Sequence, residues 1–149
     1  MAQDYSIIIG TVGQGLGVSS DAGETWTKIR QPIPSEATVR ALGVYPDNPH
    51  RVLAGSDVGI FRSEDIGVTW EKLDSPMEEL QIWSVAVDPS SPDTLFAGTS
   101  PVLIYRSKDA GESWEMVCDD FALECPNVGA PRVTSLIINP TDPKDVWVS

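Results

Sequence analysis

The chain has 149 residues, and its 10 lysine and arginine residues against 22 aspartate and glutamate residues give a formal net charge of -12. This acidic balance argues against a nucleic-acid partner, because a phosphate backbone attracts a basic surface, and it equally disfavours an anionic membrane surface. No apolar run approaches the roughly 20 residues of a membrane helix, and residues 1–5 lack the pattern of a signal peptide. We therefore expect a cytoplasmic protein, or a secreted or periplasmic one if an export signal has been removed.

Short runs of β-branched residues predict strands along the whole chain, beginning with residues 5–10. The first complete unit predicts four strands, at residues 39–45, 51–55, 59–62 and 69–72. Each run is bounded by turn residues, and no segment shows a 3.6-residue period. Segments that begin and end with proline predict the turn between the first two strands of each unit, because proline cannot lie in a central ladder. They are residues 46–49, 89–92 and 140–143.

An eight-residue motif, S-x-D-x-G-x-[TS]-W, occurs three times at a constant spacing of 44 residues, from 19 to 63 and from 63 to 107. Its members are Ser19, Asp21, Gly23 and Trp26; Ser63, Asp65, Gly67 and Trp70; and Ser107, Asp109, Gly111 and Trp114. We expect the Asp and Ser oxygens to accept hydrogen bonds from backbone N–H groups two residues on. Positive φ at the glycines and indoles covering the hairpin would complete a structural turn. We therefore assign the repeated aspartates a structural role rather than a catalytic or metal-binding one.

Two further blocks repeat in phase with this motif. Residues 39–46 match 82–89 and 133–140, and residues 51–56 match 94–99, with further copies at 6–11 and 145–149. A period near 44 residues with four strands per unit is typical of a β-propeller blade. We therefore predict an all-β chain built of four-stranded antiparallel propeller blades.

We predict blades at residues 1–30, 38–74 and 81–117, with the start of a further blade at 133–149. Residues 1–149 would therefore form one propeller segment of about three and a quarter blades. Propellers close with about four to eight blades. We therefore expect a partner that completes a ring of six to eight blades: either the remainder of a longer propeller, which we favour, or a second copy of the chain.

The repeated motif resembles the Asp-box, or bacterial neuraminidase repeat. This repeat occurs in sialidases, xyloglucanase-type glycoside hydrolases, sortilin-type receptors and photosystem II assembly propellers. The resemblance implies a propeller in which each box forms the turn between the third and fourth strands, away from the ligand-binding face. It implies no particular activity, because these relatives have different functions.

The ligand face of a propeller is built by loops that join the fourth strand to the next first strand and the second strand to the third. Arg40, Trp83 and Thr134 occupy equivalent positions near the starts of the first strands. With Arg132, Glu79 and Asp57 they are the candidate substrate-binding residues. Arginine and tryptophan bind carboxylates and stack on sugar or aromatic rings. The structural alternative is that Arg40 pairs with an acid and Trp83 fills the channel wall.

The loop at residues 117–132 is seven residues longer than its counterpart in the preceding unit and contains Cys118 and Cys125. A disulfide between them requires an oxidising compartment, and two free thiols are the alternative. A metal site formed with Asp119, Asp120 and Glu124 is disfavoured, since no His lies nearby and the spacing matches no zinc pattern. We expect no metal and no cofactor.

Two functions remain open. The favoured one is a scaffold or binding module that recognises a small-molecule, carbohydrate or protein ligand at the channel face. The alternative is a glycoside-hydrolase-like or other hydrolase or lyase enzyme with its site at the channel mouth, which needs two carboxylates roughly 5–10 Å apart. Candidates for these are Asp57, Glu78, Glu79, Asp119, Asp120 and Glu124. Sialidase chemistry is excluded because residues 30–32, Arg-Gln-Pro, break the Arg-Ile-Pro motif of that family.

Overall fold

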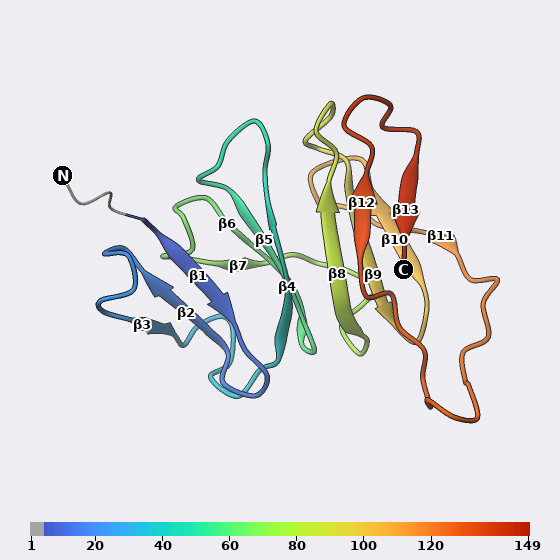
Figure 1. Ribbon diagram of the computed structural model, residues 1–149, viewed down its shortest axis with the longest axis horizontal. Helices are drawn as coiled ribbons and strands as arrows, with labels where there is room; N and C mark the ends of the chain where they lie inside the picture. Colours follow the sequence, from blue (N-terminus) through green and yellow to red (C-terminus); the bar gives the residue numbers. More distant parts are fainter. Residues whose placement is uncertain (1–4) are drawn as a thin grey trace.

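The computed structural model describes residues 5–149, which form thirteen strands in four antiparallel sheets (Figure 1). The first sheet holds β1 (Ile7–Gly10), β2 (Leu16–Ser19) and β3 (Thr27–Ile29), and the second β4 (Val39–Val44), β5 (Val52–Ser56), β6 (Gly59–Ser63) and β7 (Glu71–Lys72). The third holds β8 (Gln81–Val87), β9 (Leu95–Ser100), β10 (Ile104–Ser107) and β11 (Glu115–Cys118), and the fourth β12 (Leu136–Ile138) and β13 (Val146–Val148). Residues 5–149 include no helix that is long and apolar enough to cross a membrane.

Each sheet is a simple meander, because every strand pairs with its neighbours in sequence. The all-β class and the four-stranded antiparallel units predicted from the sequence are confirmed. The predicted strand at residues 69–72 is two residues too long at its start, since β7 begins at Glu71. Thr69 is instead held in the preceding turn, where its N–H donates to the Asp65 carboxylate at 2.8 Å.

The apolar core lies between successive sheets rather than within any one of them. One cluster fills the space between the first and second sheets and a second cluster fills that between the second and third. The first contains Leu16 and Phe61, and the second contains Leu53 and Leu95. All five residues of β5 are buried, because its two faces contact different clusters. The sheets are therefore held together by stacking face to face.

Three glycines let one sheet approach the next closely. They lie at the end of β1, in β5 and in β9. At Gly10 an added Cβ would lie 2.6 Å from the Val39 carbonyl oxygen. At Gly55 it would overlap the Ile82 side chain, and at Gly98 the Val133 side chain. The contacted residues come from the first-strand region of the following sheet, so the repeated glycine sets the spacing between sheets.

The repeated box forms the turn between the third and fourth strands of a blade-like unit, and its hydrogen bonds are nearly the same in all three copies. In the first copy, Ser19 Oγ donates to Asp21 Oδ1 at 2.7 Å and accepts the Gly23 N–H at 2.8 Å. Asp21 accepts the Thr25 N–H at 2.9 Å and the Thr25 hydroxyl at 2.6 Å. The predicted bond from the aspartate to the N–H two residues on is therefore wrong. The carboxylate instead reaches four residues on and closes the turn.

The backbone of the box requires two successive residues with positive φ. The glycines supply one, with φ of 94° at Gly23, 81° at Gly67 and 94° at Gly111, as expected. The residue before each glycine also has positive φ, near 60°, although it is Ala22, Ile66 or Ala110. Non-glycine residues rarely adopt this conformation. The dense hydrogen bonding of the box explains how it is maintained here.

Candidate functional site

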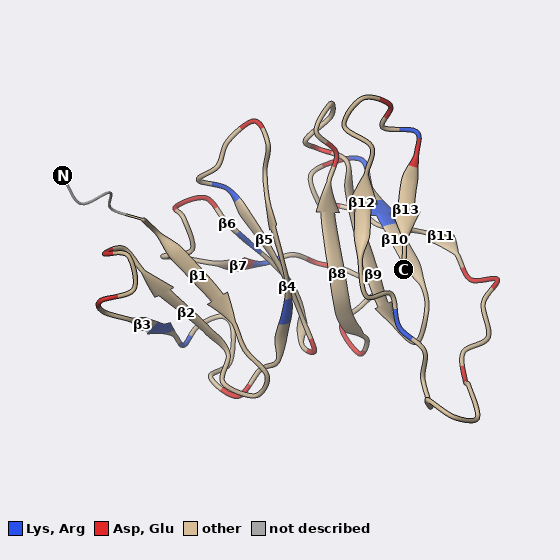
Figure 2. Cartoon of the chain, viewed as in Figure 1, with Lys and Arg blue, Asp and Glu red and all other residues tan. Residues whose placement is uncertain are grey.

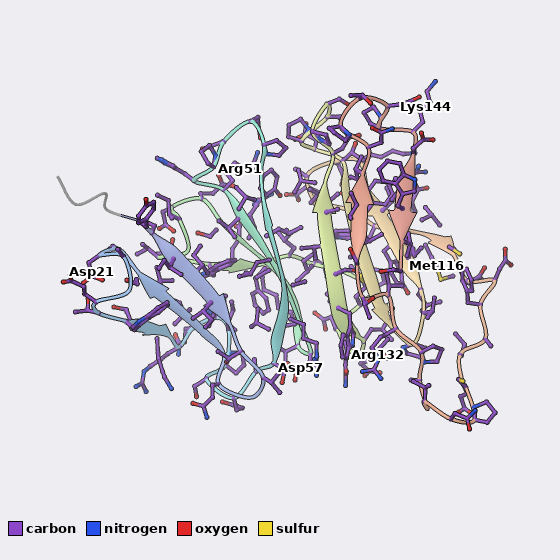
Figure 3. All side chains as sticks on the ribbon, in the orientation of Figure 1. Asp21, Arg51, Asp57, Met116, Arg132 and Lys144 are labelled. Atoms are coloured by element: carbon purple, nitrogen blue, oxygen red, sulfur yellow. The ribbon has the colours of Figure 1, made fainter. Side chains whose placement is uncertain are left out.

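The first strands of the second, third and fourth sheets, β4, β8 and β12, lie side by side (Figure 1). They run in the same direction, so their starts gather at one end of the molecule. Asp57, in the β5–β6 turn, and Arg132, before β12, lie at this end, whereas Arg51 and Lys144 lie at the opposite end (Figure 3). We call the end that carries Asp57 and Arg132 the channel face.

A groove of about 540 Å³ opens where β1, β4, β8 and β12 meet. It is lined by Gly10, Thr11, Val12, Val39, Arg40, Trp83 and Thr134. The structure thus brings together three of the residues singled out in the sequence: Arg40, Trp83 and Thr134. The groove is open, and neither Arg40 nor Trp83 is fully buried.

Two guanidinium groups pack on the ring of Trp83. The Cζ atoms of Arg40 and Arg132 each lie 4.5 Å from the ring centroid, so at most twice that distance separates them. Arg40 comes from β4 and Arg132 from the segment before β12, the strands on either side of β8. The Trp83 Nε1 donates to the Gln81 side chain at 3.3 Å, which helps to fix the ring. We call these three side chains the Arg–Trp–Arg stack.

Neither guanidinium of the stack has an ion pair or a hydrogen bond to any of residues 5–149. The Nη1 of Arg40 is shielded from solvent and also lacks a partner among them. The structural alternative, in which Arg40 pairs with an acid, is therefore not observed. Cation–π contact with Trp83 is the interaction that holds both arginines.

Three of the predicted site residues are not part of the groove lining. Arg132 borders the groove through its contact with Trp83, whereas Asp57 and Glu79 lie apart from it. The Asp57 carboxylate accepts the Thr38 N–H at 2.8 Å, so it ties the β5–β6 turn to the start of β4. Glu79 is exposed and lines a separate depression of about 550 Å³ between the second and third sheets. The other polar groups of that depression include Asp74, Glu78 and Tyr105. Glu78 also forms an ion pair with Lys72 at 3.0 Å.

The carboxyl groups with clearly lowered pKa values lie elsewhere. Hydrogen bonds from Thr25 lower the pKa of Asp21 to about 2, and those from Ser113 lower the pKa of Asp109 to about 2. Burial raises the pKa of Asp65, but hydrogen bonds from its own box outweigh burial and lower it overall. These shifts report the turn structure of the boxes rather than a catalytic pair.

The long loop holds two free thiols. Cys118 and Cys125 are both partly buried and are not joined by a disulfide. The Cys125 N–H donates to the Gly129 carbonyl at 2.7 Å, which forms a small turn within the loop. In residues 5–149, no three His, Cys, Asp or Glu side chains are grouped closely enough to hold a metal ion.

Sequence reasoning missed four residues that line the groove: Gly10, Thr11, Val12 and Val39. Thr11 and Val12 follow β1 and belong to the turn between a second and a third strand, one of the two loop classes expected at the ligand face. Because residues 6–11 match residues 51–56, the sequence already indicated a second strand followed by this turn. Its residues could therefore have been predicted as part of the site. Val12 is 76% exposed, which makes it an accessible apolar contact within the groove.

Known structures share this arrangement of sheets. An ancestral GH74 enzyme superposes with a TM-score of 0.77 at 19% identity, over 98% of this chain and 20% of that chain. The GH74 xyloglucanase from Xanthomonas campestris gives a TM-score of 0.70 at 20% identity, over 96% of this chain and 24% of that one. The chain has a β-propeller fold. Its sheets are therefore blades, and the strands β4, β8 and β12 are their inner strands.

Two further proteins are similar to this chain. YCF48 bound to D1 peptide has a TM-score of 0.63 at 15% identity, over 94% of this chain and 44% of that chain. A curated xyloglucanase of Hypocrea jecorina (strain QM6a) is 30% identical over 97 residues, which are 64% of this chain and 12% of the relative. No family model matches the chain. The chain thus spans less than half the length of each of these relatives.

Proposed function

We propose that the chain is a binding module that takes its ligand in the groove on the channel face. The observation that carries this proposal is the Arg–Trp–Arg stack, in which two arginines without acidic partners converge on one indole. Arginine and tryptophan are among the residues most enriched at binding hot spots. Loops on a rigid scaffold are also the usual position of such sites.

The composition of the groove favours binding over hydrolysis. Its lining residues include no carboxylate, whereas glycoside hydrolysis generally requires a pair of them. YCF48, a protein of similar fold, is bound to the D1 peptide in its solved structure. The proposal therefore requires only that this chain uses the same fold in a comparable way, for a peptide, carbohydrate or small molecule.

Arrays of peptides and oligosaccharides probed with the labelled full chain test this proposal. We expect ligands whose signals are lost in the Trp83→Ala variant and retained in Trp147→Ala. Trp147 is a suitable control because it is 55% exposed on β13, outside the groove. Ligands that bind both variants as well as the unmodified chain would contradict the proposed site.

A hydrolase is the second candidate, because the curated relative is a xyloglucanase and the depression beside Tyr105 gathers Asp74, Glu78 and Glu79. Incubation of the full chain with xyloglucan, followed by an assay of new reducing ends, separates the two functions. The binding module releases none. Reducing ends that disappear in the Glu79→Gln variant, with the fold intact, would support the hydrolase instead.

A further inference from the structure

We infer that the groove recognises a peptide segment that carries a carboxylate, and that this carboxylate is bound by Arg40 and Arg132. This inference rests on the proposed binding function and specifies the class of ligand. It follows from three features of the groove: the charge around it, the state of its arginines, and the atoms that the rest of its lining presents.

The first feature is the contrast between the groove and the acidic molecule around it. Acidic residues outnumber basic ones by 22 to 10, and they are spread over turns at both ends of the sheets (Figure 2). Three other arginines, Arg51, Arg62 and Arg106, have glutamate partners at 2.6–3.1 Å. Arg40 and Arg132 have none within residues 5–149. Two adjacent unpaired guanidiniums form a local anion-attracting site in an otherwise acidic molecule.

The second feature is the energetic cost of this arrangement. A shielded donor without a hydrogen bond is unfavourable, and Arg40 Nη1 is such a donor. The two cations, each 4.5 Å from the centroid of the Trp83 ring, also repel each other. A carboxylate that accepts hydrogen bonds from the open edges of the guanidiniums would relieve this repulsion. Because Trp83 already holds both side chains, little conformational entropy would be lost on binding.

The third feature distinguishes a peptide from a sugar. Guanidiniums cover the Trp83 ring, so the groove lacks the bare aromatic platform on which a sugar ring stacks. The hydroxyl of Thr11 donates to Gly15 O at 2.8 Å, and that of Thr134 donates to Ser149 O at 3.0 Å. Thr134 Oγ1 also lies 3.3 Å from Ser149 Oγ. Towards a ligand both oxygens act as acceptors, which a peptide N–H or a sugar O–H can use alike, so it is the covered Trp83 ring that favours the peptide. The exposed Val12 side chain adds a contact for an aliphatic residue.

Fluorescence anisotropy with two peptide pools tests the inference on the full chain. The first pool holds labelled octapeptide amides with two glutamates among valine, alanine and serine, and the second has glutamine in place of glutamate. The C-terminal amide leaves the glutamine pool without any carboxylate. We expect the glutamate pool to bind roughly tenfold more tightly, since a hydrogen bond to a charged group contributes at least about 1.5 kcal/mol. Its binding weakens as NaCl is raised.

Matched substitutions locate the carboxylate. Arg40→Gln and Arg132→Gln are each expected to weaken binding of the glutamate pool roughly tenfold. Arg30→Gln changes the net charge equally and leaves the affinity unchanged, because Arg30 is exposed and outside the groove. Thermal unfolding of each variant shows that the fold is retained.

The outcomes separate this inference from the proposed function. Equal binding of both pools that depends on Trp83 would keep the binding module and overturn the carboxylate. Binding of oligogalacturonate but of neither peptide pool would overturn the choice of a peptide. Failure of both pools, with Trp83-dependent ligands found on the arrays, would overturn this inference alone. Failure of the pools together with the absence of any Trp83-dependent ligand would overturn both proposals.

Discussion

Arginine has two different settings in this propeller, as Arg62 and Arg40 illustrate. Arg62 on β6 binds Glu71 at 2.6 Å and donates to the Ala110 carbonyl at 2.8 Å, so it joins its own blade to the box of the next. Arg40 on β4 contacts the Trp83 ring through its guanidinium and has no acidic partner within the described residues. Both side chains are partly buried, but only Arg62 forms hydrogen bonds that hold the scaffold together.

The same division separates the boxes from the groove. In each box the Ser, Asp and Gly groups bond to one another, and the turn packs against the preceding blade, as Gly67 does on Ile8 and Gly111 on Leu73. In the groove, equivalent positions of three blades carry three different residues: Arg40, Trp83 and Thr134. Repeated residues therefore build the scaffold, and residues that differ between repeats form the candidate site.

The largest effect is expected where one blade meets the next. In the Gly98→Ala variant the new Cβ would overlap Val133 and lie 2.6 Å from Ser84 Oγ. Overpacking of this kind costs about 1–3 kcal/mol, which chemical denaturation would measure. Gly17→Ala is the control, because a Cβ added there lies no closer than 3.3 Å to its nearest neighbour, the Ile9 side chain. The free energy of unfolding should fall less in this variant. Equal losses in both variants would refute the role of the glycine in blade spacing.

A smaller loss is expected within a box. Ser63 is 1% exposed, and its Oγ accepts the buried Gly67 N–H at 2.8 Å. Ser63→Ala leaves this donor without its partner and should reduce the free energy of unfolding by about 1 kcal/mol, the usual net contribution of one hydrogen bond. Ser35→Ala, at an exposed position, serves as the control. Ligand binding in the groove should be the same in both variants, and a selective loss in Ser63→Ala would break the division between scaffold and site.

Acid should weaken the boxes gradually. The pKa of Asp21 and that of Asp109 are lowered from 3.8 to about 2. Because the folded-state pKa lies below the unfolded value, the ionised aspartates stabilise the fold. This contribution is complete above about pH 4 and is lost as the pH falls towards 2. Melting temperatures between pH 5 and pH 2 should therefore fall, and less steeply in the Asp21→Asn variant. Identical slopes would show that the Asp21 hydrogen bonds do not contribute.

The sequence predicted the scaffold better than the site for a physical reason. The boxes recur because each blade needs the same turn, so Asp21, Asp65 and Asp109 could be recognised from spacing alone. The groove depends on which side chains meet across blades, and Asp57 shows the difficulty. It lies in a loop of the expected class, yet its carboxylate accepts a hydrogen bond from the Thr38 N–H. The link from each aspartate to the residue four positions on was likewise hidden, because turn rules describe shorter links.

The most direct test of this division is to measure the free energy of unfolding of Arg62→Gln and Arg40→Gln in parallel. Arg62→Gln breaks the ion pair with Glu71 and the bond to Ala110, so we expect a loss of about 1–3 kcal/mol. Arg40→Gln breaks no hydrogen bond within the described residues and removes only the contact with Trp83, so we expect a loss of no more than about 1 kcal/mol. A loss in Arg40→Gln as large as that in Arg62→Gln would contradict the account, because it would make the groove arginine part of the scaffold.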